Sequence, residues 1–233
     1  SLSPVLSEAI HYSVFSGGKR LRPQLLWFIG RDLGCSDELL FELGGAVELA
    51  HAFSLVHDDL PEMDNDQWRR DRETTHRKYG HGMALLAGDA LLSLAFQKIS
   101  SIEAPSSATL AFARAIGPQG MIGGQALEIE KPSHAEIHKL KTGALFELSF
   151  ILPALFMKAD PWLLSALGLQ FGKVYQWYDD VLDRVQDQGS AKNHLKSGTE
   201  LIADLKSLST KWKELNPQTE LSPFLEEFLR SLT

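Results

Sequence analysis

Several residue types and patterns are scarce in this sequence, and each scarcity excludes a class of protein. Cys35 is the only cysteine, so no disulfide forms within the chain, and this usage is typical of a reducing compartment. Lysine and arginine total 23 against 30 acidic residues, and the net charge of −7 argues against a general nucleic-acid binder. No uninterrupted apolar run reaches the roughly 18 residues of a membrane span, and no signal peptide is recognisable. We therefore expect a cytoplasmic protein with no nucleic-acid partner and no stable membrane insertion.

Strand patterns are also scarce, whereas apolar residues at helical spacing run through almost the whole chain. Apolar residues make up 44% and charged residues 23% of the 233 residues, which is typical of a globular protein. This length supplies one substantial core without requiring a second. The sequence therefore predicts a single all-α domain spanning residues 1–233, with about nine or ten helices.

Start and stop signals place the boundaries of the longer helices. Ser36-Asp37-Glu38 is an N-cap with an acidic first turn, and Pro61 ends the helix that follows. Asp160-Pro161 has the composition of a helix start, and Ser222-Pro223 repeats it near the C-terminus. Ser133 with Glu136 is a capping box. These signals and the apolar spacing predict helices at 5–14, from 21 to an end at Gly34, and at 37–59, 79–99, 133–158 and 161–186, with a loop that contains 105–107.

Two groups of aspartates stand among apolar helical residues. The first, Asp58-Asp59-Leu60-Pro61-Glu62-Met63-Asp64, ends a predicted helix, and the second is Asp179-Asp180-Val181-Leu182-Asp183. Carboxylates four residues apart share a helix face and destabilise it unless a cation neutralises them. The partial negative charge of a helix C-terminus favours a cation beside Asp58, and Mg²⁺ takes oxygen ligands. Either group alone is typical of a solvated acidic helix end; two groups facing each other across a bundle favour a metal–phosphate site.

Three basic groups accompany the acids: Gly17-Gly18-Lys19-Arg20-Leu21-Arg22, Trp68-Arg69-Arg70-Asp71-Arg72 and Lys139-Leu140-Lys141-Thr142. The glycine pair leaves backbone N–H groups available at a helix start, which is a favourable place for phosphate. Lys19 and Arg22 are three residues apart and share a face of the predicted helix. Each group alone is typical of a surface patch, but acidic and basic groups together indicate a metal-bound anion such as a diphosphate.

The order and spacing of these segments resemble the trans-prenyl diphosphate synthases, and most closely the bacterial farnesyl diphosphate synthase branch. The resemblance covers residues 4–187 and rests on GGKRLRP, ELAHAFSLVHDDLPEMDND with WRRD, LLAGDALL, GGQALEIE, LKTGAL and YQWYDDVLD. It implies an isoprenoid synthase-type bundle of antiparallel helices around a central cavity, with both aspartate motifs at its mouth. It also implies a homodimer, and a further family helix upstream of the segment that begins this sequence.

The resemblance also implies roles for individual side chains. Three Mg²⁺ ions are expected, with Asp58, Asp64 and Asp179 as their principal ligands. Asp59 and Asp183 would assist them, and Asp180 belongs to the same catalytic motif. The residues implied for isopentenyl diphosphate are Lys19, Arg22, His51 and Arg70. Those implied for the allylic diphosphate are Arg69, Lys141, Thr142 and Gln176, and Arg69 and Lys141 would also stabilise the leaving group during catalysis.

The helix that precedes Asp58 carries the residues implied to set product length. Ser54, four residues earlier, is nearly in line with Asp58, and Phe53 lies on the flank. On periodicity alone Phe53 is equally typical of an ordinary core residue; the resemblance implies that an aromatic here accompanies a farnesyl product. His51 lies two turns before Asp58 on the same face. A histidine in such an apolar stretch is usually a core residue, and only the resemblance implies its diphosphate role.

The implied reaction joins isopentenyl diphosphate to dimethylallyl or geranyl diphosphate in isoprenoid biosynthesis and gives mainly C15 farnesyl diphosphate; geranyl or geranylgeranyl products are alternatives. A noncatalytic regulatory subunit would lose the metal acids that this chain keeps. A terpene cyclase usually has an Asn/Asp, Ser/Thr, Glu second motif, so Asp179 to Asp183 argues against one. The chain departs from the family pattern at Asp71, at Glu128 and in segment 187–194. Lys192 within this segment, or Lys196 just after it, would replace the usual diphosphate-binding lysine, unless residues of this loop are missing from the sequence.

Overall fold

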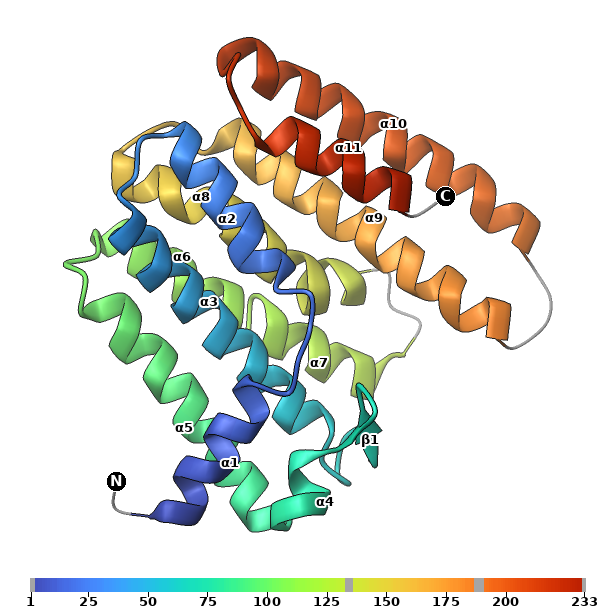
Figure 1. Cartoon of the computed structure of the whole chain (residues 1–233). Helices are drawn as coiled ribbons and strands as arrows, with labels where there is room; N and C mark the ends of the chain where they lie inside the picture. The colour runs from blue at the N-terminus through green and yellow to red at the C-terminus, as the bar shows by residue number, and fades with distance from the viewer. Residues whose placement is uncertain (1–2, 133–135, 187–190, 232–233) are drawn as a thin grey trace. The chain divides into compact units, whose positions relative to one another are not determined.

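Helices make up nearly all of the regular structure in the part of the chain that is described (Figure 1). The structure is a computed structural model that describes residues 3–132, 136–186 and 191–231, without the side chains of residues 180, 182–186 and 191–197. The eleven α-helices in these ranges confirm the predicted all-α class. They are α1 (Pro4–Val14), α2 (Leu21–Asp32), α3 (Asp37–Asp58), α4 (Thr75–Tyr79), α5 (His81–Ser100), α6 (Ser106–Ile116), α7 (Met121–Glu130), α8 (Ala144–Met157), α9 (Trp162–Gln186), α10 (Ala191–Leu215) and α11 (Leu221–Ser231).

The chain divides into two compact units. Unit 1 contains Ser1–Gln24 and Phe41–Ala104, and unit 2 contains Leu25–Leu40 and Pro105–Thr233. Helices α2 and α3 therefore each contribute residues to both units. The single domain expected over residues 1–233 stays a prediction, as does the central cavity.

In unit 1, α1 packs against α4 and α5, and it also holds a short hairpin. The hairpin consists of β1 (Trp68–Arg69) and β2 (Arg72–Glu73), which pair in antiparallel orientation. The Tyr12 hydroxyl of α1 donates a 2.8 Å hydrogen bond to the Glu73 carbonyl oxygen. The Ser13 hydroxyl lies 2.9 Å from that of Thr75. Strands of two residues carry no alternating pattern, so the sequence did not predict this hairpin.

The core of unit 1 depends on small residues at helical spacing. Helix α3 buries Leu43, Ala46, Val47, Ala50 and Phe53, and α5 buries Ala84, Ala87, Leu91, Ala95 and Ile99. Their spacing of three and four residues places each set along one stripe of its helix. The alanines allow close helix contacts, which position the ends of α3 and α5 accurately for the site described below.

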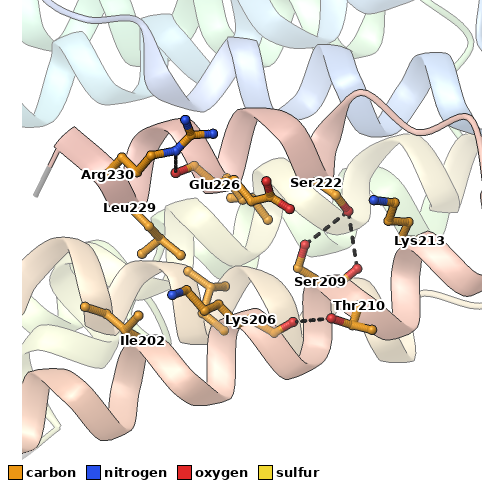
Figure 2. A pocket seen from close by; sticks show the side chains of 11 residues that line it. Ile202, Lys206, Ser209, Thr210, Lys213, Ser222, Glu226, Leu229 and Arg230 are labelled. Carbon is orange, nitrogen blue, oxygen red and sulfur yellow. Dashed lines mark hydrogen bonds between the residues drawn. The ribbon is translucent and has the colours of Figure 1, made fainter.

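In unit 2, α8 packs against α6 and α9, and α9 packs against α10. The two C-terminal helices, α10 and α11, lie side by side (Figure 1), and side chains of both, Ser209 and Ser222 among them, line a pocket (Figure 2). Phe171 of α9 is central to the core, because its ring centroid lies 5.0 Å from that of Phe146 and 4.7 Å from that of Phe228. Asp32, at the end of α2, accepts hydrogen bonds from the Trp212 indole at 2.8 Å and from the Thr219 hydroxyl. These contacts connect α2 to the C-terminal helices.

Two of the helix boundaries predicted from a cap or a proline are confirmed, those of α3 and the start of α9. Helix α3 spans Asp37–Asp58, and the Asp160 carboxylate accepts a hydrogen bond of 3.0 Å from the Trp162 amide at the start of α9. The loop predicted at 105–107 is wrong, because α6 already begins at Ser106. The helix start predicted at Ser222 is also wrong: α11 begins at Leu221, whose amide donates to the Thr219 hydroxyl. In the predicted capping box, Ser133 lies outside the described residues.

Three helical stretches are long and apolar enough to cross a membrane, by length and composition only. They are Asp37–Asp58, His81–Ser100 and Lys139–Met157. Polar residues interrupt each of these stretches, so a search for uninterrupted apolar runs in the sequence does not find them. Half of the most apolar window is buried within the protein in the first and third stretches, and 33% in the second. The absence of stable membrane insertion therefore stays a prediction.

Candidate active site

The first aspartate motif closes into a turn at the C-terminal end of α3. Asp58 is the last residue of this helix, and its carbonyl oxygen accepts a 2.9 Å hydrogen bond from the Asp64 amide. Asn65 has a φ of 54°, in the left-handed region that asparagine tolerates better than most residues. This turn brings Asp64 back to the helix end, where the partial negative charge of the helix favours a cation. Asp58 is half-buried and Asp64 is exposed.

Asp59, the second acid of the motif, points to an arginine. Its side chain is only 5% exposed, its Oδ1 accepts a 2.7 Å hydrogen bond from Arg69 Nε, and Arg69 Nη2 lies 2.6 Å from the same oxygen in an ion pair. Burial raises the pKa of the Asp59 carboxyl, although the hydrogen bond from Arg69 opposes this change. Arg69 also lies 3.2 Å from Asp66. A buried carboxylate needs such a partner, so the geometry gives Asp59 the function of holding Arg69. Its expected role as an assisting metal ligand stays a prediction.

A cluster of basic residues lies beside α3 in unit 1. Arg22 Nη1 is 3.3 Å from His51 Nε2, and Arg70 Nη1 donates a 2.6 Å hydrogen bond to the Gly17 carbonyl oxygen. Gly18, at φ +109°, accommodates Arg70, because a Cβ there would lie 2.5 Å from the guanidinium. The structure thus brings together three of the four residues expected to bind isopentenyl diphosphate.

Lys19, the fourth of these residues, is not on a helix face. It is exposed and precedes α2, and Arg20 follows it with a φ of 51°. The expectation that Lys19 and Arg22 share a face of one helix is therefore wrong. The Arg20 side chain pairs with Glu48 and donates a hydrogen bond to the Val14 carbonyl oxygen.

His51 lies within a strongly positive environment. Burial lowers its pKa well below the usual value, and the positive charges of Arg22, Arg70, Arg69 and Arg20 lower it further. The imidazole is therefore neutral at pH 7 and offers a lone pair to the Arg22 guanidinium. Neutral His51 orients Arg22 without adding to the repulsion between the arginines, so the whole cluster remains available for an anion.

Unit 2 contains three of the four residues expected to bind the allylic diphosphate, namely Lys141, Thr142 and Gln176. Lys141 and Thr142 belong to the π-helical segment η1 (Lys139–Gly143), and such segments are frequent at functional sites. Lys141 Nζ lies 2.5 Å from Glu128 Oε2, and the Thr142 hydroxyl donates to Gln176 Oε1 at 2.9 Å. Gly124 permits this arrangement, because a Cβ there would lie 2.3 Å from the Lys141 amide nitrogen.

The second aspartate motif lies near the end of α9. Asp179 is half-buried, while the side chains of Asp180 and Asp183 lie outside the described residues. Within the described part of the chain, no group of three or more His, Cys, Asp or Glu side chains is positioned to hold one metal ion. The expectation that the two aspartate motifs face each other stays a prediction.

The residues expected to set product length have distinct partners in unit 1. The Phe53 side chain is buried, and its ring packs edge-on against His57 with centroids 5.2 Å apart. The Ser54 hydroxyl donates back to the His51 carbonyl oxygen at 2.9 Å. Reasoning from the sequence did not identify His57 or Glu128 as partners of site residues. Their positions inside HDDLPEMD and GGQALEIE were the available signal.

Known proteins resemble this chain over most of its length. The family model described as polyprenyl synthetase matches residues 3–208. A farnesyl diphosphate synthase of Geobacillus stearothermophilus is 40% identical over 76% of this chain and 66% of its own length. That of Escherichia coli is 41% identical over 79% of this chain and 68% of its own length. The chain thus spans about two thirds of these curated relatives. The crystal structure of a geranyltranstransferase from Thermotoga maritima has a TM-score of 0.89 at 32% identity and covers 100% of this chain and 91% of its own.

Fold, motif order and relatives together define an enzyme that transfers prenyl groups. The chain belongs to the polyprenyl synthetase family. The predicted family, the prenyltransferase class and the isoprenoid synthase-type fold are confirmed. The relatives named farnesyl diphosphate synthase support the predicted short-chain product.

Proposed function

We propose that this chain is a Mg²⁺-dependent short-chain trans-prenyltransferase that makes mainly C15 farnesyl diphosphate. It would condense isopentenyl diphosphate with dimethylallyl or geranyl diphosphate. The observation that carries the proposal is the division of labour in the first aspartate motif. Asp59 holds Arg69, while a turn brings Asp64 back to Asp58 at the C-terminal end of α3. This arrangement suits a diphosphate that needs both a cationic side chain and a metal.

The donor set fits magnesium. Asp58 and Asp64 supply carboxylate oxygens at the C-terminal end of α3, and Asp179 supplies another from α9. When bound, Mg²⁺ would neutralise the diphosphate and make it a better leaving group. Three ions remain the expected number. Asp59 would contribute only if it gave up part of its contact with Arg69.

The side chains of this protein supply the rest of the chemistry. Arg69 and Lys141 stabilise the charge that develops on the diphosphate oxygen as its bond to the allylic carbon breaks. Thr142 and Gln176 orient the same diphosphate. The double bond of isopentenyl diphosphate then forms the new carbon–carbon bond, and the proton lost from that substrate passes to the released diphosphate. Exclusion of water prevents capture of the allylic carbon as an alcohol.

The basic cluster of unit 1 binds the second substrate. Arg22 lies against the His51 imidazole, and Arg70 donates to the Gly17 carbonyl oxygen. These two guanidinium groups suit the diphosphate of isopentenyl diphosphate, because arginine forms paired hydrogen bonds with phosphate oxygens. Lys19, exposed at the edge of this cluster, adds a third cation.

A homodimer in the cytoplasm completes the proposal. Helix α5 supports a second copy as the partner, because Leu85 and Leu86 are 48% and 53% exposed on an otherwise apolar helix. Light scattering of the purified protein gives its mass in solution directly. A mass of one chain would remove the dimer from the proposal and leave the reaction untouched.

Incubation with Mg²⁺, isopentenyl diphosphate and labelled dimethylallyl diphosphate tests the reaction. Chromatography of the dephosphorylated alcohols should show mainly the C15 product. A C10 or C20 product would assign the chain to geranyl or geranylgeranyl synthesis. No product would favour a noncatalytic subunit, and a cyclic hydrocarbon from added farnesyl diphosphate would indicate a terpene cyclase.

A further inference from the structure

His57, the residue before Asp58, lies in a notch on the surface of α5. The notch exists because residue 88 is glycine: a Cβ at that position would lie 2.1 Å from Nε2 of His57 and 2.3 Å from its Cδ2. No other amino acid at position 88 leaves room for the ring where it is. The spacing of α3 and α5 at this level therefore depends on the combination of one imidazole and one missing side chain.

Polar contacts fix the orientation of the ring in this notch. His57 Nε2 is 3.2 Å from the Leu85 carbonyl oxygen, which selects the tautomer that carries its hydrogen on Nε2. The Asp89 carboxylate lies 3.8 Å from the same nitrogen. The His57 side chain is 22% exposed, so the ring is largely enclosed. Leu85, Gly88 and Asp89 thus hold the ring from one turn of α5.

The opposite edge of His57 contacts the residue expected to limit product length. The Phe53 ring lies one turn earlier on α3, with its centroid 5.2 Å from that of His57 and the ring planes 79° apart. Asp58 follows His57 directly in the chain and ends the helix. A change in the position of the imidazole is therefore transmitted in two directions, to an aromatic ring and to a carboxylate.

We propose that His57 is a positioning residue: seated against Gly88, it fixes the Phe53 ring and the end of α3 that carries Asp58. Product length and metal use are then coupled through one contact between α3 and α5. This inference rests on the proposed function, because it assigns His57 to the same reaction. It does not make His57 a catalytic residue, since no contact with substrate is involved.

Substitutions in the notch test the inference against a control on the same helix. Gly88→Ala fills the notch and displaces the ring. Gly82→Ala adds the same methyl group to α5 where a Cβ meets nothing within 4 Å. His57→Ala removes the ring, and the double variant His57→Ala with Gly88→Ala has neither ring nor clash. Phe53→Ala is the reference for lengthened product. Each protein is assayed for product length, kcat and apparent Mg²⁺ requirement, and its unfolding midpoint is measured.

We expect Gly88→Ala to lengthen the product and raise the Mg²⁺ requirement. Its kcat should fall by about tenfold to a hundredfold, the effect of a misplacement on the order of an ångström. Gly82→Ala should behave as wild type. In the double variant, Gly88→Ala should add nothing to the effect of His57→Ala, because the clash it creates is with the absent ring. If Gly88→Ala alone does not fold, the double variant should recover folded protein.

Two results would overturn the inference. One is a folded Gly88→Ala protein that matches Gly82→Ala in product length and Mg²⁺ requirement. The other is a double variant whose loss equals the product of the two single effects, or that fails to recover folding. Failure of the proposed function is distinguishable, because the wild type would then form no prenyl product while the unfolding midpoints still report whether residues 57 and 88 interact.

Discussion

The two units hold Arg69 and Lys141, the cations proposed to stabilise the leaving group, in different ways. In unit 1, Arg69 pairs with Asp59, whose side chain is 5% exposed. In unit 2, Lys141 pairs with Glu128, and these side chains are 23% and 37% exposed. An arginine that pairs with a buried carboxylate is a fixed part of the fold, whereas a lysine paired near solvent exchanges its partner at little cost. Unit 1 therefore presents a preorganised cation, and unit 2 presents one that a ligand oxygen can take over.

The largest effect is expected at Asp58 in unit 1 and Asp179 in unit 2, the carboxylates proposed to bind the metal. Asp58→Asn and Asp179→Asn should each lower turnover by orders of magnitude. Folding should be unharmed or improved in the metal-free protein, since each substitution removes repulsion between like charges. Steady-state kinetics at saturating Mg²⁺ measures the effect, and circular dichroism confirms the fold. Near-normal turnover in either variant would contradict its assignment as a metal ligand.

The comparison of the two ion pairs becomes sharper when the acid of each is removed. Asp59→Ala removes the buried partner of Arg69 but leaves its contact with Asp66, and it should destabilise the fold by about 1.5–3 kcal/mol, the value for a hydrogen bond to a charged group. Glu128→Ala removes a pair near solvent and should cost about 1 kcal/mol or less. Urea unfolding measures both, and Glu130→Ala, an exposed acid on the same helix as Glu128, is the matched control. Equal losses for Asp59→Ala and Glu128→Ala would remove the proposed difference between the units.

Much of the framework of both sites was predictable from local signals. Pro61 ended α3 at the level of Asp58 and Asp160 began α9, because helix boundaries depend on a few neighbouring residues. The pairing of Asp59 with Arg69 was not predictable, because it requires the β1–β2 hairpin to return the chain to the end of α3. The π-helical geometry around Lys141 depends likewise on Gly124, a contact between two helices that no local pattern encodes.

The position of Lys19 shows a limit of helical reasoning at a helix boundary. Apolar spacing fitted a helix that included Lys19 and Arg22 on one face, but Arg20 adopts a left-handed conformation and α2 begins at Leu21. The pair of Arg20 with Glu48 stabilises this conformation from outside the segment. The composition of the basic cluster was thus predictable, and its geometry was not.

Substitution of Lys19 in unit 1 and of Lys141 in unit 2 should change different kinetic constants. Lys19→Ala should mainly raise the apparent KM for isopentenyl diphosphate, since its contact exists in both ground and transition states. Lys141→Ala should lower kcat more, because its contact strengthens as the leaving group gains charge. Each loss should reach about tenfold to a hundredfold, corresponding to a charged hydrogen bond of about 1.5–3 kcal/mol. Indistinguishable changes in KM and kcat would argue against separate diphosphate sites.

The smallest expected effect is on the pH dependence of folding stability, and it comes from His51 in the basic cluster of unit 1. Burial and the charges of Arg22, Arg70, Arg69 and Arg20 lower the pKa of His51 in the folded state. The unfolded chain therefore binds a proton at His51 more readily than the folded protein does. The contribution of His51 to stability is fully present above its unfolded pKa of about 6.5 and is lost as the pH falls toward the lower folded value.

A variant that cannot titrate at this position isolates the effect. His51→Gln keeps an acceptor for Arg22 but has no proton to gain, so its stability should fall less than that of the wild type between pH 7.5 and pH 5. The difference in slope is limited to about 1.4 kcal/mol per pH unit, the value for one proton. Urea unfolding across this range measures it, and the ring-proton NMR signals of His51 should stay those of a neutral imidazole from pH 8 to pH 6. Parallel stability curves for the two proteins would show that His51 titrates normally, and the cluster would then hold a charged histidine among its arginines in acid.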